Sequence, residues 1–238
     1  MCGRFTLTVR HLADVAAAVE AFLEPEHAAL HRPRYNVAPT SQHFILRLEE
    51  SRRLLVPASW GLVNRWAPDR TGAARQFNAR CETVSVKPAY RAAFRSRRCA
   101  VPIDGFYEWR GPRGAREPVR FHARDERVLW LAGLYEDWTS PETGEVTLSF
   151  SVLTTEANAV VRPVHDRMPV LLDLDGLPTW LDVEARNDAA LRALMVPAPD
   201  ACLVMTPASC RVGSVRDDDP SLLEPDPERA PRQLGLFR

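Results

Sequence analysis

The start of the chain combines two nucleophiles in one residue. Cys2 follows Met1, and aminopeptidases remove Met when the next residue is small, so we expect a mature chain with a free α-amine two carbons from a thiol. An α-amine titrates at a pH of about 8 and a cysteine thiol at about 8.5, so part of each is reactive at neutral pH. An aldehyde would condense with the amine to an imine, and the thiol would then close a thiazolidine ring.

Few other amines could compete with the amino terminus. Of the 31 basic residues, 30 are arginines and Lys87 is the one lysine. A Schiff base can therefore form at the amino terminus or at Lys87. Cys2 could also be an ordinary small residue near a frayed terminus, and the other motifs of the chain decide between the two interpretations.

Glu108 has the chemistry of a proton carrier. It stands among Phe106, Tyr107 and Trp109 in a short β run, where a carboxylate is unexpected. It is either an outward-facing residue of an edge strand or a partly desolvated carboxyl with a raised pKa. The second interpretation would suit general acid and base catalysis.

His165 is a second candidate proton carrier. It lies in a short proline-bounded loop, between Val164 and the pair Asp166 and Arg167. A lone histidine is more often structural than catalytic. Because His165 has charged neighbours and lies in a loop, a structural role and a catalytic role both remain open.

One aromatic residue and local arginines indicate contact with nucleic acid. Trp66 lies in the polar segment 64–76, which we expect to be a surface loop. Its ring is either half-buried packing or a stacking platform for a nucleobase. The segment 91–98 is the most basic window, although such a window is usually a solvated helix face. Because the formal net charge is zero, any nucleic-acid surface must be local.

Composition excludes several classes of protein. No run approaches the roughly 18 apolar residues that span a bilayer, and Met1–Phe22 has no signal-peptide pattern. The cysteines are odd in number and show no C-x-x-C spacing, so we expect reduced thiols, no metal site and no cofactor. These features are typical of a cytoplasmic protein, associated with the nucleoid when it is bound to DNA. The five cysteines are Cys2, Cys81, Cys99, Cys202 and Cys210.

The remaining pattern predicts the elements that must hold these side chains in place. It favours an α+β fold with a largely antiparallel, barrel-like β core and peripheral helices in a single domain, residues 1–215. Residues 216–238 are rich in Pro, Asp and Arg and predict a draped or disordered tail. The expected strands are 43–48, 53–57, 99–103, 106–110, 119–123, 128–135, 146–154 and 202–206, and the expected helices are 11–23, 77–83 continued by 90–95, 177–181 and 184–195.

Six sequence blocks in order resemble the SOS-response-associated peptidase family, also known as the abasic-site processing proteins. Each block is weak alone, but six in order form a specific signal over roughly the first 210 residues. The segments 64–66 and 217–219 depart from the family's usual pattern, being less apolar and more acidic. The blocks are Cys2-Gly3-Arg4-Phe5, Tyr35-Asn36-Val37-Ala38-Pro39, Trp60-Gly61-Leu62, Asn78-Ala79-Arg80-Cys81-Glu82-Thr83, Pro102-Ile103-Asp104-Gly105-Phe106-Tyr107-Glu108-Trp109 and His165-Asp166-Arg167-Met168-Pro169.

The resemblance implies a protein that shields abasic sites in single-stranded DNA by bonding covalently to them through Cys2, after autoproteolytic loss of Met1. It implies that Cys2 is the nucleophile and that Glu108 shuttles protons. His165 would protonate the sugar ring oxygen, and Asn78 would orient the aminothiol or a sugar hydroxyl.

The resemblance also implies how DNA would be held. Arg4, Arg80 and Arg167 would clamp phosphates, because a planar guanidinium binds two oxygens at once, and Trp66 would stack on a base. The expected partner is single-stranded DNA with an abasic site, and we expect a monomer.

Two other classes of function remain open at this point. In an N-terminal-nucleophile amidohydrolase or peptidase, the Cys2 thiol would attack an amide with its own amine as the base. A non-enzymatic single-strand-binding module would use Trp66 and arginines alone, which leaves Cys2, Glu108 and His165 without a role.

Overall fold

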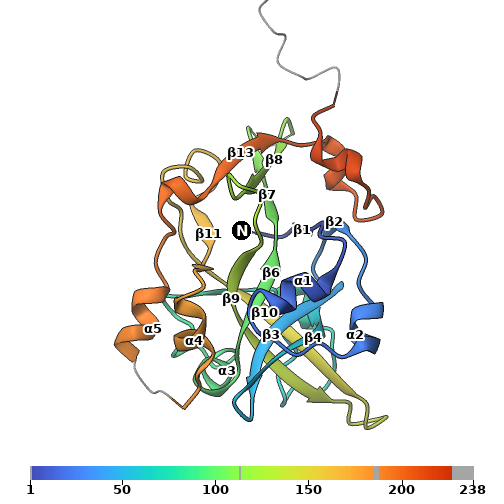
Figure 1. The fold of residues 1–238 in the computed structure, drawn as a ribbon, viewed down its shortest axis with the longest axis vertical. Helices are drawn as coiled ribbons and strands as arrows, with labels where there is room; N and C mark the ends of the chain where they lie inside the picture. The colour runs from blue at the N-terminus through green and yellow to red at the C-terminus, as the bar shows by residue number, and fades with distance from the viewer. Residues whose placement is uncertain (1, 113, 185–187, 227–238) are drawn as a thin grey trace, which may run out of the picture.

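The computed structural model describes residues 2–112, 114–184 and 188–226, and Figure 1 shows two sheets with short helices at their periphery. The strands are β1 (Phe5–Leu7), β2 (Arg34–Val37), β3 (Gln42–Glu49), β4 (Arg52–Trp60), β5 (Asn78–Arg80), β6 (Arg98–Ile103), β7 (Gly105–Arg110), β8 (Glu117–His122), β9 (Leu129–Thr139), β10 (Val146–Glu156), β11 (Arg167–Pro169), β12 (Leu171–Leu172) and β13 (Val204–Pro207). The helices are α1 (Leu12–Ala17), α2 (Pro25–Ala29), α3 (Arg91–Ser96), α4 (Gly176–Leu181) and α5 (Asp188–Leu194), with 3-10 turns η1 (Ala73–Arg75), η2 (Asp200–Cys202), η3 (Cys210–Gly213) and η4 (Pro220–Leu223).

Five strands close into a barrel. β10 pairs with both β4 and β9, which completes the ring β10-β4-β3-β6-β9. β4 and β5 run parallel to β10, while the other barrel pairs are antiparallel. Side chains are buried along the whole of β6, and its residues after Arg98 are apolar because both faces of the strand are covered.

The second sheet has the order β13-β8-β7-β1-β2 and is antiparallel throughout. The chain passes from barrel to second sheet at Asp104, the single residue between β6 and β7. A hydrophobic cluster joins the two sheets, since it contains Phe5 and Phe106 of the second sheet together with Trp60 and Phe150 of the barrel. The prediction of an α+β chain with a largely antiparallel, barrel-like core is confirmed.

One element of the site differs from its prediction. The segment 77–83 was expected to open a helix, and that prediction is wrong: Asn78–Arg80 is the strand β5. Its backbone pairs with β10 from Val152↔Asn78 to Thr154↔Arg80. An open edge of β10 thus satisfies the backbone groups of β5, and tertiary pairing outweighs local propensity.

One predicted helix is shorter than expected, and the start of another cannot be compared with its prediction. The helix predicted over 11–23 ends at Ala17, and the chain turns at Glu20 with a φ of 51°. The helix predicted over 184–195 is described from Asp188, because residues 185–187 lie outside the described chain. The predicted hairpin 43–48 with 53–57 is confirmed and extends over β3 and β4.

Candidate functional site

Cys2 is buried where the two sheets meet. Its side chain packs in the cluster that joins them, together with Met168 of β11 and Phe106 of β7. Figure 1 places the start of the chain between β11 and the pair β1 and β7. Met1, whose removal was predicted, lies outside the described residues.

Asn78 holds the backbone of Cys2. Its Nδ2 donates a hydrogen bond to the Cys2 carbonyl oxygen at 2.8 Å. Its Oδ1 is buried and has no hydrogen-bond partner within the described part of the chain. The donor of this amide therefore fixes the N-terminal segment, and its acceptor is available for an amine or a hydroxyl group.

Glu108 is placed beside Cys2 by β7. The Tyr107 N–H donates to the Arg4 carbonyl oxygen at 3.0 Å, so β7 runs along the N-terminal segment. Glu108 is only 5% exposed. The alternative of an outward-facing edge residue is excluded, because β7 lies between β1 and β8.

The electrostatics of Cys2 reflect both its burial and its neighbour. Burial and then the negative charge of Glu108 raise the pKa of the Cys2 thiol well above its ordinary value. The thiol is therefore protonated at neutral pH, and it needs a base before it can attack. Glu108 is the carboxylate whose charge acts on the Cys2 thiol.

His165 lies two residues before β11, the strand that contributes Met168 to the hydrophobic cluster around Cys2. Its Nδ1 accepts a hydrogen bond from the Arg167 N–H at 2.9 Å and lies 2.9 Å from an Asp166 carboxylate oxygen. A neutral Nδ1 can accept from this N–H, whereas a protonated Nδ1 would instead donate to the Asp166 carboxylate. The loop thus fixes the orientation of the ring through its own backbone.

Arg167 is engaged with protein groups. Its guanidinium makes a two-pronged ion pair with Glu82, with N···O distances of 2.5 and 2.9 Å, and donates to the Thr154 carbonyl oxygen at 2.6 Å. Glu82 raises the pKa of Arg167, so this pair is charged at neutral pH. Arg167 therefore ties β11 to the loop after β5, a role that the sequence did not reveal.

An open cavity of about 420 Å³ lies beside this ion pair, and it brings together Arg80, Arg162 and Arg167. Arg80 is exposed on β5, and Arg162, which lies in no recognisable sequence motif, is exposed as well. Arg4 instead folds back on the chain, donating to the Gly3 carbonyl oxygen at 3.0 Å. The exposed arginines at this cavity are therefore Arg80 and Arg162, of which Arg162 also donates to the Ala157 carbonyl oxygen at 3.0 Å. Glu156 and Asp166 line the cavity as well.

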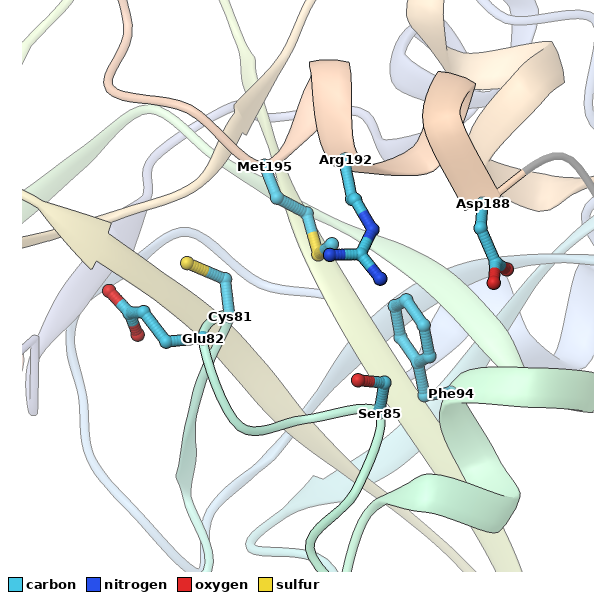
Figure 2. Close-up of a pocket in the computed structure, with 7 residues that line it drawn as sticks. All are labelled: Cys81, Glu82, Ser85, Phe94, Asp188, Arg192 and Met195. Carbon is cyan, nitrogen blue, oxygen red and sulfur yellow. The ribbon is translucent and has the colours of Figure 1, made fainter.

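A second cavity, of about 210 Å³, shares Glu82 with the first region (Figure 2). Its wall includes Cys81, whose pKa is raised mainly by burial. Cys81 is therefore a protonated thiol and a poor competitor for Cys2 as a nucleophile. The lining residues are Cys81, Glu82, Ser85, Phe94, Asp188, Arg192 and Met195.

Trp66 is presented to solvent. Its side chain is 71% exposed, so the half-buried alternative is excluded. The loop that carries Trp66 contacts Gly61 through the Ala73 carbonyl oxygen. Gly61 has a φ of 128°, and a Cβ built on it would lie 2.6 Å from that oxygen, so this position requires glycine. The Trp138 indole N–H anchors the same loop at the Ala67 carbonyl oxygen, 2.8 Å away.

Two of the four arginines in the basic segment 91–98 make contacts within the protein. Arg98 is buried and donates to the carbonyl oxygens of Phe94, Trp180 and Asp182. Arg97 pairs with Glu136 at 2.8 Å. Only the α3 part of this window remains as exposed basic surface.

The described ranges offer no candidate for two other kinds of site. No group of three or more His, Cys, Asp or Glu side chains there could hold a metal ion. No described helix is long and apolar enough to cross a membrane.

Comparison with known sequences gives a consistent result. The family described as SOS response associated peptidase (SRAP) matches residues 1–215. The abasic site processing protein YoqW of Bacillus subtilis (strain 168) is 34% identical over 228 residues, 94% of this chain and 99% of that protein. The abasic site processing protein HMCES of Gallus gallus is 30% identical over 235 residues, 86% of this chain and 69% of that protein.

Solved structures share the fold. A protein from Bacteroides thetaiotaomicron superposes with a TM-score of 0.85 at 23% identity, covering 94% of this chain and 100% of that one. A phage-related protein from Bordetella bronchiseptica has a TM-score of 0.64 at 25% identity, covering 87% and 93% of the two chains.

Proposed function

This chain belongs to the SOS response associated peptidase (SRAP) family, and from that premise we propose that it recognises abasic sites in single-stranded DNA and shields them through a covalent bond to Cys2. The relatives named abasic site processing proteins support the substrate. The observation that carries the mechanism is the placement of Cys2 between the Asn78 amide and the charge of Glu108.

The proposed reaction begins at the ring-opened form of the abasic sugar, which carries an aldehyde. The α-amine of Cys2 adds to the aldehyde carbon, and loss of one water gives an imine. The thiol then adds across the C=N bond: sulfur bonds to carbon, and the thiol proton ends on nitrogen. The product is a five-membered thiazolidine, with no oxidant or reductant required.

Closing this ring protects the strand. An imine withdraws electrons, acidifies the neighbouring carbon and so promotes loss of the 3′ phosphate. Once sulfur has added, the C=N bond is gone and this route to strand cleavage is closed. The buried thiol beside the amine therefore explains shielding rather than cleavage.

Three side chains serve the proton transfers. Glu108 accepts the proton of the Cys2 thiol, whose raised pKa makes such a base necessary. His165, whose ring is held by contacts of its Nδ1 with the Arg167 N–H and the Asp166 carboxylate, donates a proton to the sugar ring oxygen as it leaves. The Oδ1 of Asn78 accepts from the α-amine or from a sugar hydroxyl.

Binding of the flanking strand is assigned to exposed groups. Arg80 and Arg162 contact phosphates at their shared cavity, and Trp66 stacks on a base. Arg167 acts by holding the His165 loop, since its guanidinium is already paired with Glu82. We propose that the protein binds one single strand as a monomer, in the cytoplasm at nucleoid DNA.

The reaction requires a free α-amine on Cys2. While Met1 is attached, the Cys2 nitrogen is an amide and cannot form an imine. We therefore propose that Met1 is lost before the first reaction, by an aminopeptidase or by autoproteolysis, and intact-mass spectrometry of the active protein should show a chain that begins at Cys2.

Denaturing electrophoresis with single-stranded DNA that carries one abasic site tests the proposal. We expect an adduct that survives heat, is absent with intact DNA and is abolished by Cys2→Ala. Lys87→Ala is the control and should form the adduct normally. Loss of the adduct in Lys87→Ala but not in Cys2→Ala would refute the mechanism, and hydrolysis of an amide substrate without any DNA adduct would instead support the amidohydrolase alternative.

A further inference from the structure

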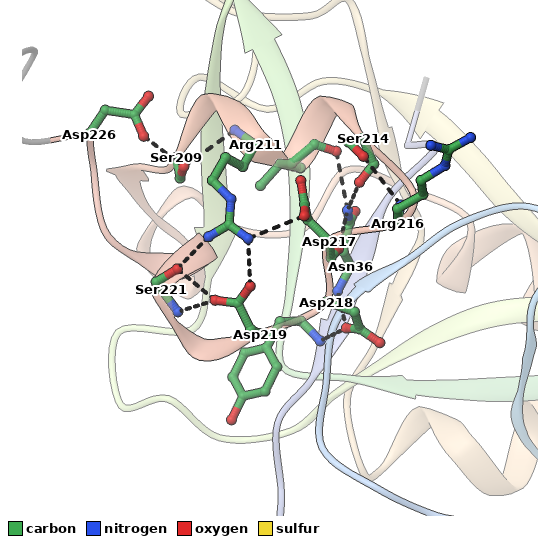
Figure 3. A network of polar contacts seen from close by, with 12 residues as sticks. Asn36, Ser209, Arg211, Ser214, Arg216, Asp217, Asp218, Asp219, Ser221 and Asp226 are labelled. Carbon is green, nitrogen blue, oxygen red and sulfur yellow. Dashed lines mark hydrogen bonds and ion pairs between the residues drawn. The ribbon is translucent and has the colours of Figure 1, made fainter.

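Residues 209–226 form a compact segment on β2, which we call the C-terminal latch (Figure 3). Its centre is Asp218, whose Oδ1 accepts from the Tyr35 N–H at 2.6 Å and the Asn36 N–H at 3.0 Å. Its Oδ2 accepts from Arg34 at 2.5 Å and from Arg32 at 3.0 Å. One carboxylate thus satisfies two backbone donors and two guanidinium groups of the strand region.

The side chain of Asn36 also ties β2 to the latch. Its Nδ2 lies within hydrogen-bond distance of the carbonyl oxygens of Val212, Ser214 and Asp217, at 3.2, 2.9 and 2.9 Å. Asn36 is almost fully buried. The latch therefore grips β2 through both backbone and side chain.

The strand β2 is connected to Glu108 through Tyr107. The Tyr107 hydroxyl donates to the Tyr35 carbonyl oxygen at 2.9 Å. Its ring is completely buried in a small cluster with Val212 and Leu222 of the latch. Tyr107, the neighbour of Glu108, is thus held by Tyr35 of β2. Asp218 in turn accepts a hydrogen bond from the Tyr35 N–H.

The strand β2 also determines the position of Cys2. It pairs with β1 at Phe5↔Val37 and Leu7↔Arg34, and β1 begins three residues after Cys2. A shift of β2 would therefore move both the nucleophile and the strand that carries its base.

We propose that Asp218 is a positioning residue: by holding β2, it keeps Cys2 and Glu108 in the relative geometry that thiol addition needs. The inference rests on the proposed function and goes beyond it, because the contacts of Asp218 are with the β2 region and not with Cys2 or Glu108. The family match ends at residue 215, so this residue lies past the matched region. Its neighbours in the latch, Asp217 and Asp219, instead bind Arg211 at 3.2 and 2.8 Å.

Three variants separate this role from general stability. Asp218→Ala removes all four contacts, and Asp218→Asn keeps an oxygen for the two N–H groups while losing the charge. Asp217→Ala is the matched control, since it removes an exposed contact of the same latch. Each is measured for single-turnover crosslinking at saturating abasic DNA, in the wild-type and in the Glu108→Gln background.

We expect Asp218→Ala to slow crosslinking about tenfold to a hundredfold, the range that a displacement of about 1 Å produces. Asp218→Asn should lie between it and the wild type, and Asp217→Ala should stay within about twofold. In the Glu108→Gln background, Asp218→Ala should add less than about twofold, because the geometry it protects is that of Glu108 and Cys2. A residue that only stabilises the fold would give the same fold-loss in both backgrounds.

A second variant and a second readout cover the other outcomes. Tyr107→Phe removes only the hydrogen bond from the hydroxyl group to Tyr35. It should show the same dependence on the Glu108→Gln background, even if Asp218→Ala does not fold.

Alkylation of Cys2 by iodoacetamide without DNA, followed by peptide mass spectrometry, should be faster in Asp218→Ala than in the wild type and in Asp217→Ala. Wild-type rates in both Asp218→Ala and Tyr107→Phe would overturn the inference. If the wild type forms no adduct, the proposed function is overturned instead. In that case, an alkylation rate in Asp218→Ala equal to that of the wild type would also reject the positioning role.

Discussion

The side-chain amide of Asn78 donates to the backbone carbonyl of Cys2 at 2.8 Å, across 76 positions of sequence. β5 exists as a strand only because it pairs with β10, and this pairing brings Asn78 to the N-terminal segment. The contact joins the barrel to the start of the chain at the point where the proposed chemistry occurs.

Asn78→Ala should slow crosslinking without preventing it. The variant loses one hydrogen bond to Cys2 and the Oδ1 acceptor, which together correspond to about 1–3 kcal/mol, or roughly fivefold to a hundredfold in rate. Single-turnover rates at saturating abasic DNA measure the effect. Asn78→Asp is the paired variant: it keeps an acceptor but loses the donor, and a rate equal to that of the wild type would remove the Cys2 contact from the mechanism.

Glu108→Gln should separate chemistry from binding. It keeps the shape and most hydrogen bonds but cannot carry a proton. Crosslinking should therefore slow by about a hundredfold to ten-thousandfold or somewhat less, since an aminothiol reacts with aldehydes unaided. Noncovalent affinity for a strand with a non-reactive abasic analogue should hardly change. Rates measured between pH 5 and pH 8, as approximate limits, should depend on pH in the wild type and lose that dependence in the variant. Equal rates at every pH would make His165 the leading proton carrier.

Arg80→Ala should reduce the salt dependence of DNA binding. For single strands the log of the binding constant falls with the log of salt concentration by roughly 0.7 per phosphate contact, so the slope should flatten by about that amount. Fluorescence anisotropy over a salt series provides the measurement. Arg52, which lies over the Phe22 ring at the far hairpin, is the matched control. If both variants keep the wild-type slope, Arg80 does not bind phosphate.

Arg167→Ala should act on stability more than on the salt slope. Removing the guanidinium breaks the Glu82 pair and one of the two hydrogen bonds to the Thr154 carbonyl, which keeps the Cys81 N–H at 3.0 Å. Because Glu82 is half-exposed, we expect a loss of about 1–3 kcal/mol. Urea unfolding measures this loss. Arg192→Ala, an exposed arginine of the neighbouring cavity, should stay within about 0.5 kcal/mol of the wild type. A flattened salt slope in Arg167→Ala with unchanged stability would restore its role as a phosphate clamp.

His43 should make the fold sensitive to acid. Burial lowers its pKa to about 3, from an ordinary value of 6.5, and its Nε2 lies 2.7 Å from the Pro102 carbonyl oxygen. Between these pH values the unfolded chain binds a proton that the folded chain does not, so stability falls as pH falls from 6.5 towards 3. The slope approaches about 1.4 kcal/mol per pH unit for one proton. His43→Gln should be less stable at neutral pH and show a flatter acid limb in urea titrations, and an unchanged slope would assign the acid loss to other groups.

The sequence alone determined the class of fold and indicated the groups on which the proposed chemistry rests. Cys2 behind a removable Met1, a carboxylate among aromatic residues at Glu108 and alternating strand patterns are local properties, so they can be read from neighbours in the chain. The strands of the barrel carry enough β-branched and aromatic residues for their pattern to match their structure.

Tertiary structure decided which of these groups meet and which are already occupied. Asn78–Arg80 became a strand because β10 offered it backbone partners, against the helix that its sequence favours. Arg167 carries a phosphate-binding side chain, yet Glu82 neutralises it in the folded chain. Asp218 looked like part of an acidic tail, but folding brings it to two N–H groups of β2. Each outcome depends on a partner distant in sequence, and hydrogen bonding or charge pairing between such partners exists only after the chain has folded.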